Sequence, residues 1–183
     1  MRYSMLLLAL AAGGALYAQD VAASVAALQQ AYNGQKGKIL GAAQAMPEDG
    51  YSLVPGEGSR TFGAAVGHIA DAMAGTCGGL AGTPTQLNAE RGMTAKADLV
   101  AALEKGFELC DKAYGETTAD NFFAPVQSFR GPTPRNASLW GNFAHSEEMY
   151  GTLAVYLRVK GIVPPSSAGR GGRGKGKGKG RGK

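Results

Sequence analysis

The sequence predicts an all-α four-helix bundle. In four separate stretches, apolar residues recur at the three- and four-residue spacing that places them on one side of a helix. Segments rich in Gly, Pro, Ser and Thr separate these stretches and favour turns. With 183 residues and 44% hydrophobic content, the chain is long enough for one domain with a proper core.

Residues 1–18 have the pattern of a secretory signal peptide. Arg2 supplies a positive start, residues 5–17 are apolar, and the small residue Ala18 precedes the polar Gln19. An uncleaved membrane anchor is the alternative, but this apolar segment is shorter than the ~20 residues that a spanning helix needs. We therefore expect an exported protein, periplasmic or secreted.

The bundle itself is expected in residues 19–167. Its first three helices are predicted over 20–46, where Pro47 stops the first, over 61–80, and over 94–115, where Thr94 is the expected N-cap. Residues 81–93 form a loop, and residues 116–132 form an irregular link. The inward stripes are Val21, Val25, Leu28, Tyr32, Ile39, Ala43 and Met46; Phe62, Val66, Ile69, Met73, Cys77 and Leu80; and Leu99, Leu103, Phe107, Cys110 and Tyr114.

The closing helix is the most clearly bounded element. Thr133 is the expected N-cap and Pro134 suits the first helical position. Gly161 can take the left-handed conformation that ends a helix, and Pro164-Pro165 prevent continuation. The core-facing positions are Leu139, Phe143, Tyr150, Leu153, Ala154 and Leu157.

The chain has two histidines, and each lies beside a core stripe. His68 in the second helix and His145 in the closing helix are both roughly 120° away from the stripe of their own helix. Asn142 and Tyr156 fall on the same flank as His145, as do Met149 and Thr152. Neighbouring helices of a bundle can bring such flanks together at a shared groove, which Asn142 and Tyr156 would line.

The closing helix resembles that of the DinB/YfiT-like four-helix-bundle proteins, whose pattern is roughly H-x-x-x-H-Y-G-x-x-x-x-Y-x-R-x-x-G-x-x-P-P. The residues that fit are His145, Tyr150, Gly151, Tyr156, Arg158, Gly161, Pro164 and Pro165, and the segment GHIADA supplies His68. The resemblance spans about residues 24–167. It departs at Met149, which stands where the family has its second closing-helix histidine.

This resemblance implies a metal site in which His68 and His145 are two of three ligands. Zn, Ni or Mn are the metals that the family implies, whereas two imidazoles with the Met149 thioether would suit a softer ion such as Cu(I). Asp71, one turn after His68, is a candidate additional ligand or a residue that orients one. Alternatively, both histidines are hydrogen-bonded structural residues.

The C-terminal segment 168–183 alternates Gly with basic residues and has no apolar side chain large enough to support folding. We expect it to be disordered. Without its seven Lys and Arg side chains the formal net charge falls from +5 to −2, so the high pI does not indicate a nucleic-acid-binding domain. The tail could still contact an anionic envelope surface or polymer, or it could be merely a solvated segment.

Cys77 and Cys110 lie on the inward stripes of successive helices. In an oxidising compartment they can form a disulfide, which would close a loop of about 34 residues and be worth roughly 3 to 4 kcal/mol in the loop-entropy model. The alternative is a pair of buried thiols that pack as small hydrophobic groups.

Three functions are consistent with these observations. The first is a binding protein that keeps the groove but catalyses no reaction. The second is a metal-dependent hydrolase or thiol-transferase-like enzyme of the cell envelope. The third is adhesion through the basic tail. An unidentified small molecule is the expected ligand of the groove, and a homodimer is consistent with the fold.

We predict that the exported mature protein begins near Gln19, because signal peptidases cut after small residues such as Ala18. Intact-mass spectrometry of material exported by a bacterial host measures this directly. A dominant species that retains Met1 would contradict the prediction.

Overall fold

Four long helices carry the fold of the computed structural model, which describes residues 2–128 and 131–168, with side chains in 19–128 and 131–168. They are α1 (Arg2–Ala45), α2 (Phe62–Leu80), α4 (Lys96–Gly115) and α5 (Arg135–Val159). The short elements are the 3-10 helices η1 (Glu48–Ser52) and η2 (Pro165–Ser167), the helix α3 (Ala89–Gly92), and the strands β1 (Pro125–Ser128) and β2 (Gly131–Pro134).

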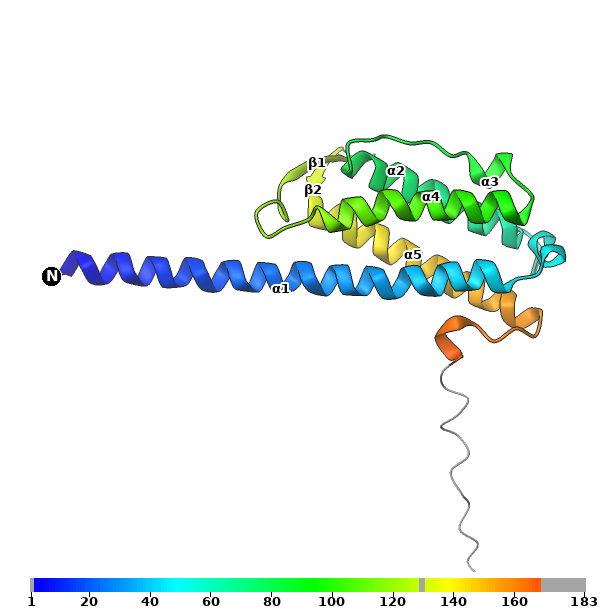
Figure 1. Cartoon of the computed structure of the whole chain (residues 1–183), viewed down its shortest axis with the longest axis horizontal. Coiled ribbons are helices and arrows are strands. Elements are labelled where there is room, and N and C mark those ends of the chain that lie inside the picture. Colours follow the sequence, from blue (N-terminus) through cyan, green and yellow to red (C-terminus); the bar gives the residue numbers. More distant parts are fainter. Residues whose placement is uncertain (1, 129–130, 169–183) are drawn as a thin grey trace, which may run out of the picture.

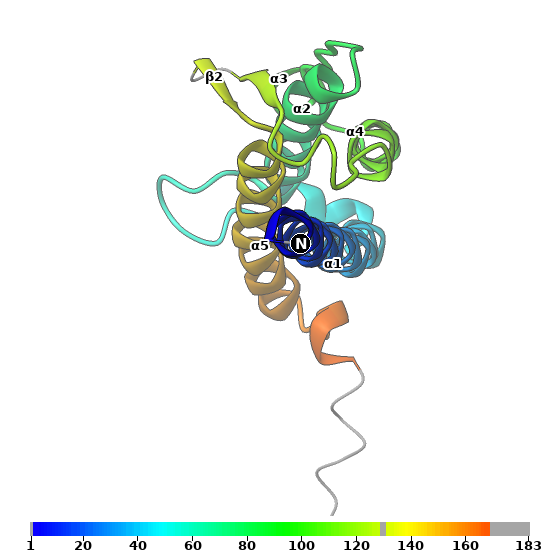
Figure 2. The ribbon, with the colours of Figure 1, turned by 90° about the vertical axis from the view of Figure 1, so that its left-hand side faces the viewer.

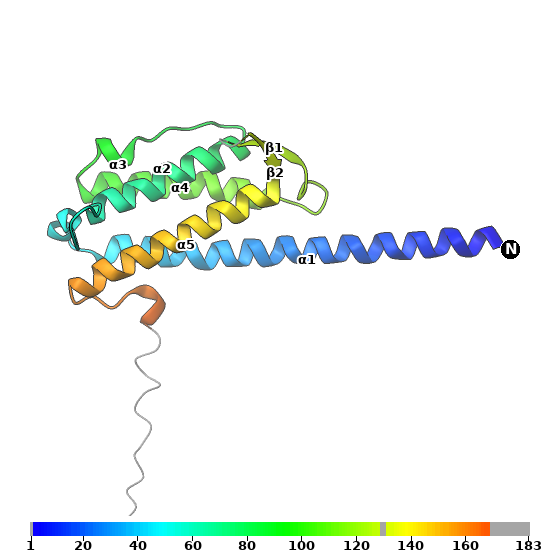
Figure 3. The ribbon, with the colours of Figure 1, turned by 180° about the vertical axis from the view of Figure 1, so that it is seen from behind.

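The long helices form two layers. Helices α2 and α4 lie side by side in one layer, and α1 and α5 cross in the other (Figures 1 and 2). Helix α5 contacts both α1 and α2, so it joins the two layers. The N-terminal part of α1 extends well past the other helices, as Figure 3 shows from behind.

One core lies between the layers, and the inward stripes predicted from the sequence form it. Every residue of the three stripes predicted before the closing helix is buried. In α5 the predicted stripe is also buried, apart from the partly exposed Phe143. The burial of these stripes confirms the predicted helical fold. The prediction succeeded because the 3.6-residue period of a helix indicates which of its sides faces inward.

The two predicted terminal segments remain predictions. Helix α1 continues without a break past the expected cleavage point after Ala18. The predicted disordered tail lies outside the described residues except for Ala168. In the ranges 2–128 and 131–168, no helix is both long and apolar enough to cross a membrane.

The start of the closing helix differs from the prediction. Thr133 and Pro134 belong to β2, which pairs antiparallel with β1, so the described residues contain a small sheet where the sequence indicated an irregular link. Helix α5 begins at Arg135. Its first free N–H groups bond to the main chain: Arg135 N donates to Ala124 O at 2.9 Å and Asn136 N to Phe122 O at 2.9 Å. A side-chain cap is unnecessary once the preceding link supplies acceptors.

Helix α4 is also capped differently from the prediction. It begins at Lys96 rather than after Thr94, and Lys96 N donates to the carboxylate of Glu48 at 3.1 Å. That acceptor comes from η1, far away in the sequence, and its negative charge suits a helix N-terminus. The Lys96 ammonium in turn donates to Gln44 O and Met46 O at the end of α1.

Gly161 ends α5 as predicted. Its φ is +74°, a conformation that costs glycine little. Gly161 N donates to Arg158 O at 2.9 Å and Ile162 N to Leu157 O at 2.8 Å. These two bonds make a Schellman end, which satisfies the last carbonyls of the helix.

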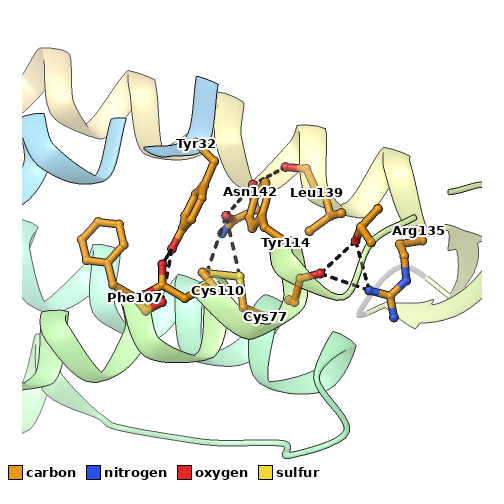
Figure 4. Close-up of a disulfide and its surroundings, with 11 residues drawn as sticks. Tyr32, Cys77, Phe107, Cys110, Tyr114, Arg135, Leu139 and Asn142 are labelled. Atoms are coloured by element: carbon orange, nitrogen blue, oxygen red, sulfur yellow. Dashed lines mark hydrogen bonds between the residues drawn. A yellow bond between two sulfur atoms is a disulfide. The ribbon is translucent and has the colours of Figure 1, made fainter. Parts of the chain in front are cut away.

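A disulfide and a close helix contact hold α2 against α4. Cys77 and Cys110 are bonded, with an S–S distance of 1.99 Å and a Cα–Cα distance of 4.8 Å (Figure 4). At Gly106, a Cβ would lie 3.1 Å from Ala70 O, so glycine lets the two backbones approach closely. Of the two arrangements that the sequence left open for the cysteines, the structure has the disulfide.

We predict that replacing both cysteines by alanine lowers the free energy of unfolding by about 3 to 4 kcal/mol, because the bond closes a long loop in the unfolded chain. Urea unfolding of the double variant Cys77→Ala/Cys110→Ala beside the parent measures the difference. The parent in excess reductant is the control and should move toward the variant. An unchanged unfolding midpoint in the variant would contradict the prediction.

Candidate functional site

The two histidines meet where α2 packs against α5. His68 Nε2 lies 3.2 Å from His145 Nε2, and both side chains are partly exposed. The ring centroids are 5.1 Å apart and the ring planes are tilted by 60°. The contact therefore joins nitrogen to nitrogen, and the rings do not stack. The two flanks that the sequence placed beside the core stripes thus face one another.

Glu90 holds the other nitrogen of His68. Its Oε2 lies 2.8 Å from His68 Nδ1, and its Oε1 accepts a hydrogen bond from Arg60 Nε at 2.7 Å. The Glu90 side chain is 28% exposed, which places this pair at the edge of the core. A carboxylate on Nδ1 fixes the orientation of the ring and directs Nε2 toward His145.

Glu90 reaches His68 because α3 lies directly on α2. A Cβ on Gly67 would lie 2.6 Å from Glu90 N, so only glycine allows this approach. Asp71 fastens the same contact: its two oxygens accept hydrogen bonds from Ala89 N at 2.9 Å and Glu90 N at 3.0 Å. The segment GHIAD therefore both supplies a histidine and seats the carboxylate that orients it.

The hydrogen bonds assign the protons of the two rings. Burial alone would raise the pKa of Glu90, but hydrogen bonds from Arg60 and His68 outweigh it and hold the pKa below its ordinary value. An ionised Glu90 can only accept, so His68 Nδ1 must donate. Burial and then the neighbouring His68 lower the pKa of His145. In the His68 tautomer that donates from Nδ1, Nε2 is an acceptor, and His145 Nε2 can donate to it.

A pocket of about 760 Å³ extends from the histidine pair along the groove between α2, α5 and the β1–β2 hairpin. Apart from the two histidines, the described residues of its walls have uncharged side chains, most of them small: Ala72, Gly75, Thr76 and Leu80 from α2, Gln127, Ser128, Pro132 and Thr133 from the hairpin, and Ala137, Ser138, Gly141 and Asn142 from α5. The two histidines are the only titratable side chains among the described residues that line it.

The remaining predicted site residues lie in different places. Asn142 lines the pocket and is 5% exposed. Tyr156 does not: its hydroxyl donates to Arg60 O at 2.6 Å and its ring packs against Phe62 in the core. Met149 is buried in the same core. Asp71 bonds to α3 through both oxygens.

The two Nε2 atoms are separated by about the distance between two nitrogens bound to one metal ion. With a metal–nitrogen bond of about 2.0–2.1 Å and a tetrahedral angle, two bound nitrogens lie roughly 3.3 Å apart, close to the 3.2 Å observed. The His68 tautomer that donates from Nδ1 to Glu90 has its lone pair on Nε2, the atom that faces His145. Among the described residues, however, no three His, Cys, Asp or Glu side chains are grouped to hold an ion. The separation of the two imidazoles thus matches two ligand positions, and the described residues supply no third.

The family model described as the DinB superfamily matches residues 31–152, which include both histidines. The chain belongs to the DinB superfamily. Two solved structures agree with this DinB fold. A DinB-like protein from Bacillus cereus ATCC 10987 has a TM-score of 0.66 at 16% identity, over 75% of this chain and 93% of that one. A DinB-like protein from Bacillus subtilis has a TM-score of 0.60 at 18% identity, over 74% and 93%. A search of curated proteins finds no match.

Sequence reasoning missed Glu90, Arg60 and Gly67. Glu90 lies in a segment predicted as a loop, 22 residues after His68, and no helical spacing relates the two positions. The only signal was Gly67 itself, since a glycine inside an amphipathic helix often marks a close backbone approach.

We predict that Gly67→Ala in this DinB protein destabilises the fold by about 1–3 kcal/mol, because the new methyl group meets the backbone of α3, which cannot move without losing both Asp71 bonds. Gly75→Ala on the same helix is the matched control, since its Cβ would meet nothing within 4 Å. It should be neutral or stabilising by up to about 1 kcal/mol.

Urea unfolding gives both values, and ¹⁵N NMR of the imidazoles reports the site. In the parent, His68 should carry its proton on Nδ1, and Gly67→Ala should lose this preference. Equal stability of the two alanine variants would show that α3 does not depend on Gly67.

Proposed function

We propose that this DinB protein binds one divalent transition-metal ion through His68 and His145 and presents it to a small molecule in the adjoining pocket. The observation that carries the proposal is the 3.2 Å separation of the two Nε2 atoms, with Glu90 fixing the tautomer that leaves His68 ready to coordinate. In the family-wide pattern a third histidine would stand at Met149. Here the ion would keep positions open beyond its two imidazoles.

The donor set favours Zn²⁺, Ni²⁺ or Cu²⁺ over Mn²⁺. Imidazole suits the later metals of the first transition row, and two neutral nitrogens without a carboxylate are a poor site for a harder ion. Glu90 lies on the outer nitrogen of His68 and would raise the basicity of that ring. A bound ion would supply a Lewis-acidic position for an oxygen, nitrogen or sulfur donor at the end of the pocket.

Binding without turnover is the function that the side chains support best. A hydrolytic enzyme needs a base beside the metal-bound water. Glu90, the carboxylate that contacts His68, is bonded to Arg60 and His68 through its two oxygens. Asp71 is bonded to α3 in the same way. The Met149 change removes a ligand from a site of the DinB type and leaves its groove intact, which supports a binding role.

We further propose that the protein acts in the cell envelope. The signal-peptide pattern of residues 1–18 and the Cys77–Cys110 bond support an oxidising compartment. In that setting, the basic residues of the tail would attract anionic surface polymers or lipids through charge alone.

We predict that the purified parent protein, dialysed against Zn²⁺ or Ni²⁺, retains about one ion per chain, and that His68→Gln and His145→Gln each lose it, because one imidazole cannot hold the ion alone. Glu90→Gln should weaken binding about 10- to 100-fold, since it removes the carboxylate that orients His68. Elemental analysis and competition with a chromophoric chelator measure these effects.

Position 149 provides a matched pair of variants. Met149→His places a third imidazole one turn from His145 and should tighten Zn²⁺ and Ni²⁺ binding well beyond the parent. Met149→Leu keeps the bulk but removes the thioether, and it should lower affinity for Cu(I) only. Absence of metal from both the parent and Met149→His would overturn the proposal and return the histidines to a structural role.

A further inference from the structure

Two glycines widen the pocket at a cost to the helices that contain them. Gly75 in α2 and Gly141 in α5 both line the pocket, and a Cβ on either would meet nothing within 4 Å. Each makes its helix less stable than alanine would. The glycines that serve packing differ, since a Cβ on Gly67 or Gly106 would touch neighbouring backbone. Gly75 and Gly141 therefore contribute open volume rather than close packing.

A buried amide lies in the same wall of the pocket. Asn142 is 5% exposed and lines the pocket. One end of its amide faces Tyr114 Oη at 3.1 Å and the sulfurs of Cys77 and Cys110 at 3.8 and 3.9 Å (Figure 4). The other end has no hydrogen-bond partner among the described residues.

The disulfide indicates whether the oxygen or the nitrogen of the Asn142 amide faces the pocket. Tyr114 has one hydroxyl proton, and it also lies 2.8 Å from Leu139 O. Bonded sulfurs have no proton to donate, so an inward carbonyl of Asn142 would compete with Leu139 O for that single proton. Turning the amide by 180° keeps its shape and lets its N–H groups donate to Tyr114 Oη and the sulfurs. The carbonyl of Asn142 then faces the pocket as an acceptor.

We propose that the pocket takes an elongated, uncharged molecule with an apolar portion along the Gly75–Gly141 walls, an N–H or O–H group that donates to Asn142, and a metal-binding group at the histidine end. The volume of about 760 Å³ lies in the range of pockets that enclose drug-sized ligands. The described residues of the walls offer no charge to pair with an ionised ligand body, whereas their small apolar surfaces and hydroxyls suit a neutral one. Only the metal-binding group rests on the proposed function above.

The experiment compares a long and a short metal-binding probe on the Co²⁺-loaded protein. Acetohydroxamate and octanohydroxamate share one head group and differ in an alkyl chain, and the visible spectrum of Co²⁺ reports binding of either. In the parent, octanohydroxamate should bind on the order of 100-fold more tightly, because each buried methylene raises affinity about fourfold and roughly three to four of its six additional methylenes would be buried.

Gly75→Leu and Gly141→Leu should each reduce that preference to about threefold or less, since the new side chain occupies the volume of the alkyl chain. Gly151→Leu should leave the affinities for both hydroxamates unchanged. Gly151→Leu is the matched control: Gly151 is an exposed glycine of α5, its Cβ would also meet nothing within 4 Å, and it does not line the pocket. Leucine favours helices over glycine, so all three variants should fold.

A second arm uses metal-free protein and octanamide, which has N–H donors and an apolar chain but no strong metal-binding group. Saturation-transfer NMR should detect its alkyl chain on the parent and on Gly151→Leu, and not on Gly75→Leu. Failure of Co²⁺ to bind would overturn the proposed metal site. The octanamide result would then test by itself whether the pocket binds an uncharged ligand. Equal binding of the two hydroxamates by the parent, or equal effects of Gly151→Leu and Gly75→Leu, would overturn the pocket inference.

Discussion

The contact of α3 with α2 is the constraint on which the candidate site depends. Gly67 has no side chain to keep the two backbones apart, and Asp71 bonds the first two free N–H groups of α3. Carboxylates are favoured at helix N-termini, where unsatisfied N–H groups meet the positive end of the helix dipole. This contact places Glu90 on His68, and Glu90 determines which nitrogen of His68 faces His145.

The same helices use glycine for two opposite purposes. Gly67 and Gly106 bring neighbouring main chains together, so an added Cβ would lie 2.6 Å and 3.1 Å from backbone atoms. Gly75 and Gly141 leave space open beside the histidines. In the sequence, both types of glycine look alike, as residues that weaken a helix. Only the packing of the helices shows which glycines lie at a backbone contact and which line the pocket.

The sequence predicted those features that depend on residues close together in the chain, and it missed those that depend on tertiary contacts. Helical periodicity gave the four long helices, their buried sides and the flanks on which His68 and His145 lie. It could not give the start of α4, because the group that caps it is Glu48 from another element. The start of α5 was missed for the same reason, since Ala124 O and Phe122 O accept from its first N–H groups. Glu90 was missed because only tertiary packing brings α3 to α2.

The separation of the two histidines is set by bonds beyond either ring. At one end of α2, Tyr156 of α5 donates to Arg60 O, just before the helix begins. At the other end, the guanidinium of Arg135 donates to Leu80 O at 3.2 Å and to Ala113 O at 3.3 Å, so α5 is joined to the last turns of both α2 and α4. The disulfide prevents α2 and α4 from separating. With α5 attached to α2 on both sides of the pair, the 3.2 Å between the Nε2 atoms is a property of the whole bundle. An ion that replaces the shared proton would therefore find its two nitrogens already in place, with little ordering left to oppose binding.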